Sequence, residues 1–415
     1  RAFAEGATSA GVDVVDLGLC STDEMYFAAG SLDAAGAMFT ASHNPAQYNG
    51  IKLCRAGARP VGAETGLEQI KSAVAASLAS GHLAGPGPGG AGGLGGVGGL
   101  GGGSRGAVTR ADVLGDYAAK VRSFVDVSVL RPLSVVADTA NGMGGLVVPA
   151  VFEGLPFRLE ILFPELDGTF PNHPADPIQP ENLKALQARI LETGADVGLA
   201  FDGDADRCFL VDDRGVALSG STTTALVAAA MLEKRPGAII LHNLICSKAV
   251  PEIIRERGGT PVRTRVGHSY IKAVMADTGA LFGGEHSGHY YFQDNYRADS
   301  GAIAALVVLE VLSKAGRPLS EIRRDFERFA ASGEINTEVG DPAAVIERVS
   351  EAFRGSPQDR LDGLTVDLGD WWFNLRPSNT EPLLRLNLEA PDSESCRART
   401  DEVLALIRDE RNAEH

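Results

Sequence analysis

The chain is organised around Val197-Gly198-Leu199-Ala200-Phe201-Asp202-Gly203-Asp204-Ala205-Asp206-Arg207-Cys208-Phe209-Leu210-Val211, in which an acidic turn joins two apolar runs. Short apolar runs bounded by turn residues are typical of buried strands. The three carboxylates of the turn repel one another by about 1 kcal/mol or more per pair even in a watery setting, so a cation is expected between them. Carboxylate oxygens favour magnesium or calcium over zinc.

Two other interpretations of this turn remain open. It could be a solvated acidic turn, because Asp and Gly are common turn residues. It could also be a helix-loop-helix calcium site, but that loop needs Gly at its sixth position and Glu at its twelfth, where this chain has Arg207 and Asp213. A site of only three carboxylates leaves coordination positions open for a phosphate, which favours Mg²⁺.

Length and composition limit the function classes. A chain of 415 residues predicts three or four domains, and a net charge of −16 disfavours binding to nucleic acid or to an anionic membrane surface. The sequence has no apolar run of 18 or more residues, so no membrane-spanning helix is expected. Five scattered cysteines without metal spacing indicate reduced thiols and a cytoplasmic protein.

Strands and helices alternate from the start of the chain, which predicts an α/β fold. Residues 37–40 are expected to form a strand that delivers Ser42 and His43 into a turn fixed by Asn44-Pro45, and the strand containing Lys52 follows. A Ser-His pair alone fits a plain surface turn as well as a nucleophile.

Residues 85–106 contain 14 glycines among 22 residues. Such a stretch cannot bury enough apolar surface to offset its ordering entropy, so a disordered insertion is predicted. It is too long for a phosphate-binding glycine loop, and it interrupts what we interpret as one domain.

Two later loops concentrate polar side chains around glycines. Residues 264–269 contain His268, and residues 283–289 contain Glu285, Ser287 and His289. The last three alternate, so an extended loop would put them on one face, suited to reading sugar hydroxyls. A metal cluster or a polar turn is the alternative.

A third loop, at residues 374–382, is rich in hydrogen-bond donors. An Arg side chain can hold a phosphate through two parallel hydrogen bonds, and hydroxyl and amide groups add to such a site. A capped turn is the alternative interpretation. The candidate phosphate-binding residues are Arg376, Ser378, Asn379 and Thr380.

Together these motifs resemble the α-D-phosphohexomutases in order and spacing, over nearly the whole chain except the glycine-rich insertion. The motifs are residues 40–45, 202–207, 284–289 and 376–382. The resemblance implies three related α/β domains and a smaller α+β domain around a central cleft. The limits we expect are 1–126, 127–220, 221–333 and 334–415. The family's N-terminal segment is not in this sequence, and we expect that a piece is absent.

The resemblance also implies a mechanism. Ser42 would be carried as a phosphoserine that binds Mg²⁺ together with Asp202, Asp204 and Asp206. Phosphoryl transfer to a hexose monophosphate would give a hexose 1,6-bisphosphate, whose other phosphate returns to Ser42. Arg207 would position the phosphoserine, His43, Lys52 and His268 are acid or base candidates, and the residue 376–380 loop would hold the distal phosphate.

Residues 284–292 and 370–374 look most like those of bacterial phosphomannomutases. The expected reaction is therefore interconversion of mannose 6-phosphate and mannose 1-phosphate by a monomer or homodimer. Phosphoglucomutase or dual activity is the close alternative, and phosphoglucosamine mutase activity a distant one. A magnesium-dependent phosphatase and a non-catalytic phosphosugar-binding protein remain as hypotheses from other classes.

Overall fold

The computed structural model describes residues 1–62, 65–80, 104–378 and 383–408. The predicted glycine-rich insertion lies outside the described residues as far as residue 103, and so do the candidate residues Asn379 and Thr380. Residues 104–106, the end of the insertion, are described, and there the backbone N–H of Gly106 donates to the carbonyl of Thr8 at 2.9 Å. No helix of the described residues is long and apolar enough to cross a bilayer.

The second and third domains share one sheet topology. In the second, the strand order is β7-β6-β8-β9, and in the third it is β11-β10-β12-β13. In each sheet the first three strands are parallel and the fourth is an antiparallel edge strand. The strands are β6 (Ser134–Asp138), β7 (Arg158–Leu162), β8 (Val197–Phe201), β9 (Cys208–Asp212), β10 (Ile239–Asn243), β11 (Thr260–Thr264), β12 (Phe282–Gly284) and β13 (Tyr290–Phe292).

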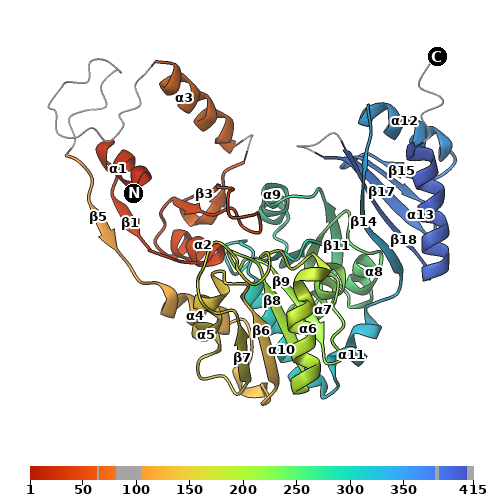
Figure 1. Ribbon diagram of the computed structural model, residues 1–415, viewed down its shortest axis with the longest axis horizontal. Helices are drawn as coiled ribbons and strands as arrows, with labels where there is room; N and C mark the ends of the chain where they lie inside the picture. Colours follow the sequence, from red (N-terminus) through yellow and green to blue (C-terminus); the bar gives the residue numbers. More distant parts are fainter. Residues whose placement is uncertain (63–64, 81–103, 379–382, 409–415) are drawn as a thin grey trace.

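Helices cover these two sheets (Figure 1). They are α5 (Gly144–Phe152), α6 (Lys184–Thr193), α7 (Gly220–Lys234), α8 (Ala249–Glu256), α9 (His268–Thr278), α10 (Gly301–Ala315) and α11 (Leu319–Ile322), with 3-10 turns at Val127–Val129, Pro180–Leu183 and Arg323–Asp325. Helices α7 and α10 are buried along almost their whole length and belong to one hydrophobic core that also includes β6, β8 and β12. The two domains therefore pack as a continuous unit.

The first domain is arranged differently in its described part. Strand β1 (Val14–Asp16) pairs in parallel with β5 (Val108–Arg110), while β2 (Gly36–Phe39), β3 (Ile51–Arg55) and β4 (Arg59–Pro60) form a separate antiparallel sheet. A largely apolar cavity of about 1170 Å³ is lined by residues of both sheets. The helices are α1 (Ala2–Ser9), α2 (Thr22–Ser31), α3 (Leu67–Ala79) and α4 (Leu114–Arg122), with a 3-10 turn at Ala56–Ala58.

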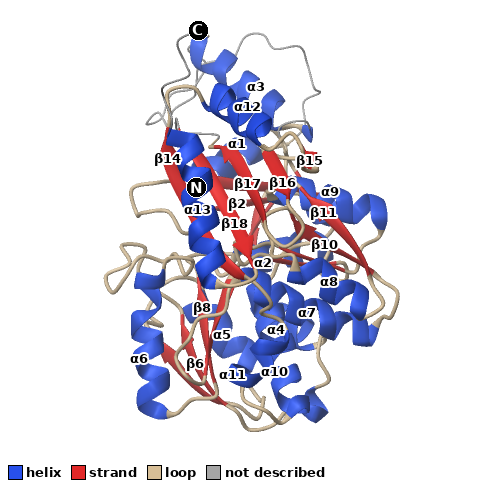
Figure 2. Ribbon diagram, turned by 90° about the vertical axis from the view of Figure 1, so that its right-hand side faces the viewer, coloured by secondary structure: helices blue, strands red, loops and turns tan. Residues whose placement is uncertain are grey.

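The last domain has a core of its own. Its antiparallel sheet has the order β14-β18-β17-β16-β15, formed by β14 (Ala330–Glu338), β15 (Gln358–Asp359), β16 (Leu364–Asp367), β17 (Trp372–Pro377) and β18 (Leu383–Ala390). Helices α12 (Pro342–Ala352) and α13 (Ser393–Arg408) pack on it, and their apolar residues form a cluster separate from the main core. Figure 1 shows this α+β domain at the opposite side of the molecule from α1, and in Figure 2 the domain faces the viewer.

A fully buried carboxyl group joins the first domain to its neighbours. Asp23, near the start of α2, accepts hydrogen bonds from Tyr117 of α4 and, at 2.7 Å, from Ser300 just before α10. Burial raises the pKa of Asp23 to about 7, whereas an unfolded Asp has a pKa of about 3.9. The folded state therefore holds a proton that the unfolded state has lost.

We expect the stability of the metal-free protein to fall as pH rises from about 4 through about 7, because Asp23 must ionise in place. Asp23→Asn keeps the shape and removes this titration, so the variant should lose less stability over the same interval. Thermal unfolding at successive pH values measures how stability changes with pH in the parent and in the variant. Equal slopes in parent and variant would show that another group is responsible.

Candidate active site

Ser42 lies in the turn after β2 with a left-handed backbone, φ +54°. Its N–H donates to Thr40 Oγ1 at 2.8 Å, and its Oγ lies 3.0 Å from Asp202 Oδ2. Such a backbone conformation costs energy in a non-glycine residue and is kept where the surroundings enforce it. Here the turn is held against the β8–β9 loop: a Cβ at Gly203 would come within 2.4 Å of the Ser42 carbonyl oxygen. Glycine at 203 thus permits the contact.

The carboxylates of Asp202, Asp204 and Asp206 converge in that loop. Their side chains are almost completely buried, and each offers an oxygen within 4.8 Å of the others. Asp204 Oδ1 and Asp206 Oδ1 have no hydrogen-bond partner. Buried carboxylate oxygens without partners are costly unless a cation binds them, so these residues fit a divalent metal with oxygen ligands.

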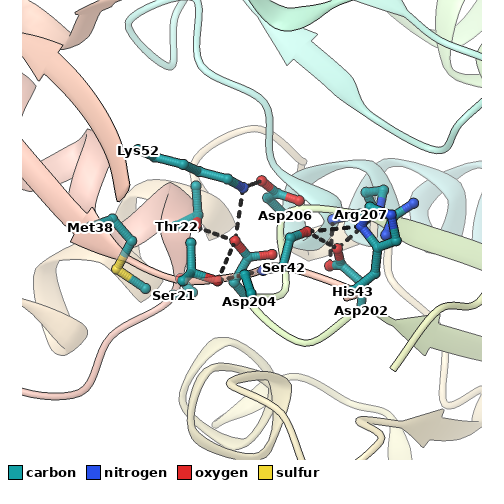
Figure 3. Close-up of polar contacts among 12 residues, drawn as sticks. Ser21, Thr22, Met38, Ser42, His43, Lys52, Asp202, Asp204, Asp206 and Arg207 are labelled. Atoms are coloured by element: carbon teal, nitrogen blue, oxygen red, sulfur yellow. Dashed lines mark hydrogen bonds and ion pairs between the residues drawn. The ribbon is translucent and has the colours of Figure 1, made fainter. Parts of the chain in front are cut away.

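Lys52 of β3 supplies the positive charge of this cluster (Figure 3). Its Nζ lies 2.8 Å from Asp204 Oδ2 and 2.6 Å from Asp206 Oδ2. Burial opposes the charge of the lysine, but Asp206 and Asp204 together raise the pKa of Lys52 well above its ordinary value. Lys52 is therefore a cation at neutral pH and cannot accept a proton.

Arg207 and His43 flank the serine. Arg207 is buried, and its Nε donates to Asp202 Oδ2 at 2.9 Å, while Asp176 lies 3.6 Å from its Nη2. Burial raises the pKa of Asp202 to about 6 although Arg207 opposes that rise. His43 Nδ1 lies 3.3 Å from Ser42 Oγ, and burial lowers the pKa of this imidazole, which favours its neutral form.

The sequence prediction missed two threonines that hold Asp204. Thr22 Oγ1 donates to Asp204 Oδ2 at 2.6 Å, and Thr40 Oγ1 lies 3.1 Å from the same oxygen. Thr40 directly precedes the serine motif, so its position was a usable signal. Thr22 is 182 residues from Asp204 in the chain, and no spacing links the two.

A second cluster borders the acidic triad. His268 begins α9, and its ring centroid lies 4.1 Å from that of His289. Both Nδ1 atoms face Asp299 Oδ2, at 3.4 Å and 3.0 Å respectively, and His289 Nδ1 is 3.6 Å from Asp206 Oδ1. Burial lowers the pKa of His289 to about 4. Burial opposes the charge of His268, but Asp299 raises its pKa. Sequence analysis did not select Asp299.

The expected extended loop at residues 283–289 is wrong in its geometry. Gly283 and Gly284 belong to β12, and Glu285 N donates to the carbonyl of His289 at 3.0 Å. The segment is a tight turn between two antiparallel strands, so alternation does not place its side chains on one face. Glu285 is buried and accepts hydrogen bonds from Tyr291 at 2.7 Å and from the Gly267 N–H at 3.1 Å.

Of the predicted donor-rich loop, residues 374–377 belong instead to strand β17 of the last domain, and Ser378 follows it. Arg376 stands directly opposite Arg385 of β18, and Glu334 of β14 lies 2.9 Å and 3.5 Å from the two guanidinium groups. Ser378 Oγ is 3.5 Å from Arg385 Nη2. Like charges placed opposite each other are destabilising, so this pair indicates an anion site. Arg385 was missed because it lies outside the motif.

Comparison with protein families decides the identity. Models of the four phosphoglucomutase/phosphomannomutase domains match residues 1–79, 115–215, 219–329 and 334–406. The chain belongs to the phosphoglucomutase/phosphomannomutase family. This result confirms the resemblance found in the sequence, and with it the architecture of three α/β domains and a smaller α+β domain. This phosphohexomutase is an enzyme, an isomerase that acts by phosphoryl transfer.

Relatives of this phosphohexomutase include the phosphohexose mutases of Xanthomonas campestris, 41% identical over 98% of this chain and 88% of that protein. The phosphomannomutase of Salmonella montevideo is 40% identical over 98% and 87%. A solved phosphoglucomutase/phosphomannomutase family protein from Burkholderia thailandensis has a TM-score of 0.82 at 29% identity, covering 99% of this chain and 86% of that one. Family membership and the acidic triad together support a divalent metal and phosphohexose substrates.

Proposed function

We propose that this protein is a phosphomannomutase that interconverts mannose 6-phosphate and mannose 1-phosphate through a phosphorylated Ser42. The single observation that carries the proposal is the Ser42 hydroxyl, 3.0 Å from a buried aspartate of the metal triad and flanked by Arg207 and His43. The relatives named phosphomannomutase support mannose as the preferred sugar. Phosphoglucomutase activity is the second candidate, favoured by the description of the family.

The metal would be held by Asp202, Asp204, Asp206 and the phosphate of Ser42. When bound, Mg²⁺ would offset negative charge on the transferring phosphoryl group. Lys52 is already a cation beside two of these carboxylates, so it limits their repulsion before the metal binds. Arg207 would orient the phosphate through the guanidinium that now holds Asp202.

In the transfer step, the bond between phosphorus and Ser42 Oγ breaks as a bond forms to the free hydroxyl oxygen of the hexose monophosphate. The proton of that hydroxyl passes to a base, and the oxygen of Ser42 recovers a proton. His43 suits the exchange with Ser42, because its imidazole is near Oγ and burial favours its neutral form. His268 and Lys52 are the remaining candidates.

The second half-reaction needs the hexose 1,6-bisphosphate to turn around, so the distal site must accept either phosphate. Arg376 and Arg385, with Ser378 beside them, supply donors that do not depend on sugar orientation. Asn379 and Thr380 stay part of this proposed site. The separate core of the last domain allows it to close over the substrate and exclude water. Glu285, Ser287 and His289 stay the proposed sugar contacts.

Arg376→Met should raise KM for hexose phosphates by about 10-fold to 100-fold, because the variant loses the binding free energy of one charged hydrogen bond to the phosphate. The change in kcat should be smaller. Arg385 remains to pair with Glu334, so the fold should persist. Arg354→Met is a matched control, since this exposed arginine of the same domain pairs, among the described residues, with neighbouring Glu351. Steady-state kinetics on both variants tests the site, and an unchanged KM in Arg376→Met would remove Arg376 from it.

The proposed reaction is tested by phosphorus NMR with mannose 6-phosphate, magnesium and a trace of hexose 1,6-bisphosphate, run beside glucose 1-phosphate. Appearance of mannose 1-phosphate without free phosphate supports the proposal, and faster turnover of glucose 1-phosphate would make phosphoglucomutase the better name. Free phosphate alone would indicate a phosphatase. We also propose that the protein is cytoplasmic, because all five cysteines are free and buried. A monomer or homodimer is the oligomeric state that we propose.

A further inference from the structure

We propose that Lys272 is a positioning residue: its buried ammonium holds Asp299, which in turn fixes the proton on Nδ1 of His289 and faces Nδ1 of His268. The inference rests on the proposed function, since it assigns a task within the same site. Lys272 lies on α9 and Asp299 in the segment between β13 and α10. Neither residue belongs to a motif that the sequence analysis selected.

The burial of Lys272 is the first observation. The residue is 2% exposed, and its Nζ lies 3.1 Å from Asp299 Oδ1. An ammonium removed from water costs several kcal/mol unless its partners replace the lost hydration. Lys272 finds the carboxylate of Asp299 and the ring of Tyr26, whose centroid is 3.7 Å from Nζ. Burial opposes the charge, but these neighbours raise the pKa of Lys272.

Through Tyr26, the contacts of Lys272 reach a second domain. It lies on α2 of the first domain, whereas Lys272 lies on α9 of the third. The lysine therefore contacts the first domain through Tyr26 and the histidine pair through Asp299. Both contacts lie beside Asp206, which Nδ1 of His289 approaches to 3.6 Å. The position of the imidazoles is thereby tied to the packing of the two domains.

The hydrogen-bond chemistry fixes the tautomers. An ionised carboxylate only accepts hydrogen bonds, so His289 Nδ1, 3.0 Å from Asp299 Oδ2, must carry a proton. Tyr291 donates to Glu285 at 2.7 Å, so its oxygen accepts from His268 Nδ1 at 3.0 Å. Each neutral ring then keeps Nε2 as its proton-accepting atom. A positioned acceptor of this kind is what proton transfer to or from a sugar hydroxyl requires.

A transition-metal site is the competing interpretation, because His268, His289 and Asp299 have ligand spacing. The charge of Lys272 argues against it. The ammonium already neutralises Asp299, and a cation bound to the same carboxylate would be repelled by it. His289 and Asp299 are therefore interpreted as a hydrogen-bonded pair beside His268.

The test combines Lys272→Met, Lys272→Arg and the double variant Lys272→Met/Asp299→Asn, with Lys184→Met as a surface control that breaks an exposed contact with Glu181. Lys272→Met should lower kcat by about 10-fold to 100-fold with KM changed by less than about threefold, and Lys272→Arg should recover most of the loss. The double variant removes both buried charges together, so it should fold even where Lys272→Met does not.

Nitrogen NMR of histidine-labelled protein supplies a measurement that does not depend on turnover. In the parent, both Nδ1 atoms should be protonated. In Lys272→Met and the double variant this preference should be lost at His289, while the hydrogen bond with Tyr291 should keep it at His268. Unchanged tautomers, or equal kcat losses in the Arg and Met variants, would overturn the proposal, as would tight binding of Zn²⁺ to the parent that removes the Nδ1 protons. A parent with these tautomers but no mutase activity would leave the positioning role standing and reject the proposed function.

Discussion

Ser42→Ala should lower mutase turnover by about 10³-fold or more while leaving the fold intact. Among the described residues, only Ser42 has a hydroxyl in a strained turn that contacts both the acidic triad and an imidazole. Its Oγ lies 3.0 Å from Asp202 and 3.3 Å from His43. Removing the hydroxyl of this half-buried side chain removes the phosphoryl carrier but leaves the packing around it almost unchanged. The measurement is the initial rate of mannose 1-phosphate formation.

The matched control for this variant is Ser128→Ala, in an exposed turn where the serine hydroxyl donates to Asp126 at 2.6 Å. It should keep full activity. Thermal unfolding of Ser42→Ala should match that of the parent, which separates lost chemistry from lost structure. Turnover within about tenfold of the parent would exclude Ser42 as the phosphoryl carrier.

Lys52→Met should have the second-largest effect. It leaves Asp204 and Asp206 without the cation that now lies 2.8 Å and 2.6 Å from them. Removing one partner of a buried ion pair costs about 3 kcal/mol or more, so the metal-free variant should be markedly less stable than the parent. Its kcat/KM should also fall, by about 100-fold, because the charge beside the transferring phosphate is lost.

Magnesium should recover more stability in Lys52→Met than in the parent, since the metal then supplies the missing positive charge. Thermal unfolding with and without Mg²⁺ measures this difference. Lys184→Met, which breaks an exposed contact with Glu181, is the control and should change neither quantity. A metal-free Lys52→Met protein as stable as the parent would contradict the assignment of Lys52 as the neutralising cation.

The sequence was informative where a local pattern sets a local structure. The apolar runs on either side of residues 202–207 became the buried strands β8 and β9, in which Asp212 is the one charged residue. The serine turn followed from Asn44-Pro45, and the α/β architecture from alternation of strands and helices. The domain limits stay a prediction, and so do the chemical roles of the site residues.

Contacts between distant segments could not be predicted in this way. Thr22, Asp299 and Lys272 lie in segments without motifs, and only the packing of separate domains brings them near the acidic triad. Arg385 joins Arg376 through strand register, which a single sequence does not specify. The turn at residues 285–289 was misjudged because alternation predicts a shared face only in an extended segment.

The central claim is that Ser42 carries the phosphoryl group, and mass spectrometry of the protein after incubation with hexose 1,6-bisphosphate and Mg²⁺ tests it most directly. The account predicts one added phosphoryl group, located on the peptide that contains Ser42. On addition of mannose 6-phosphate, the phosphoryl group should pass from Ser42 to the sugar, without release of inorganic phosphate. An active protein whose Ser42 is never phosphorylated, or a phosphoryl group on another side chain, would contradict the account.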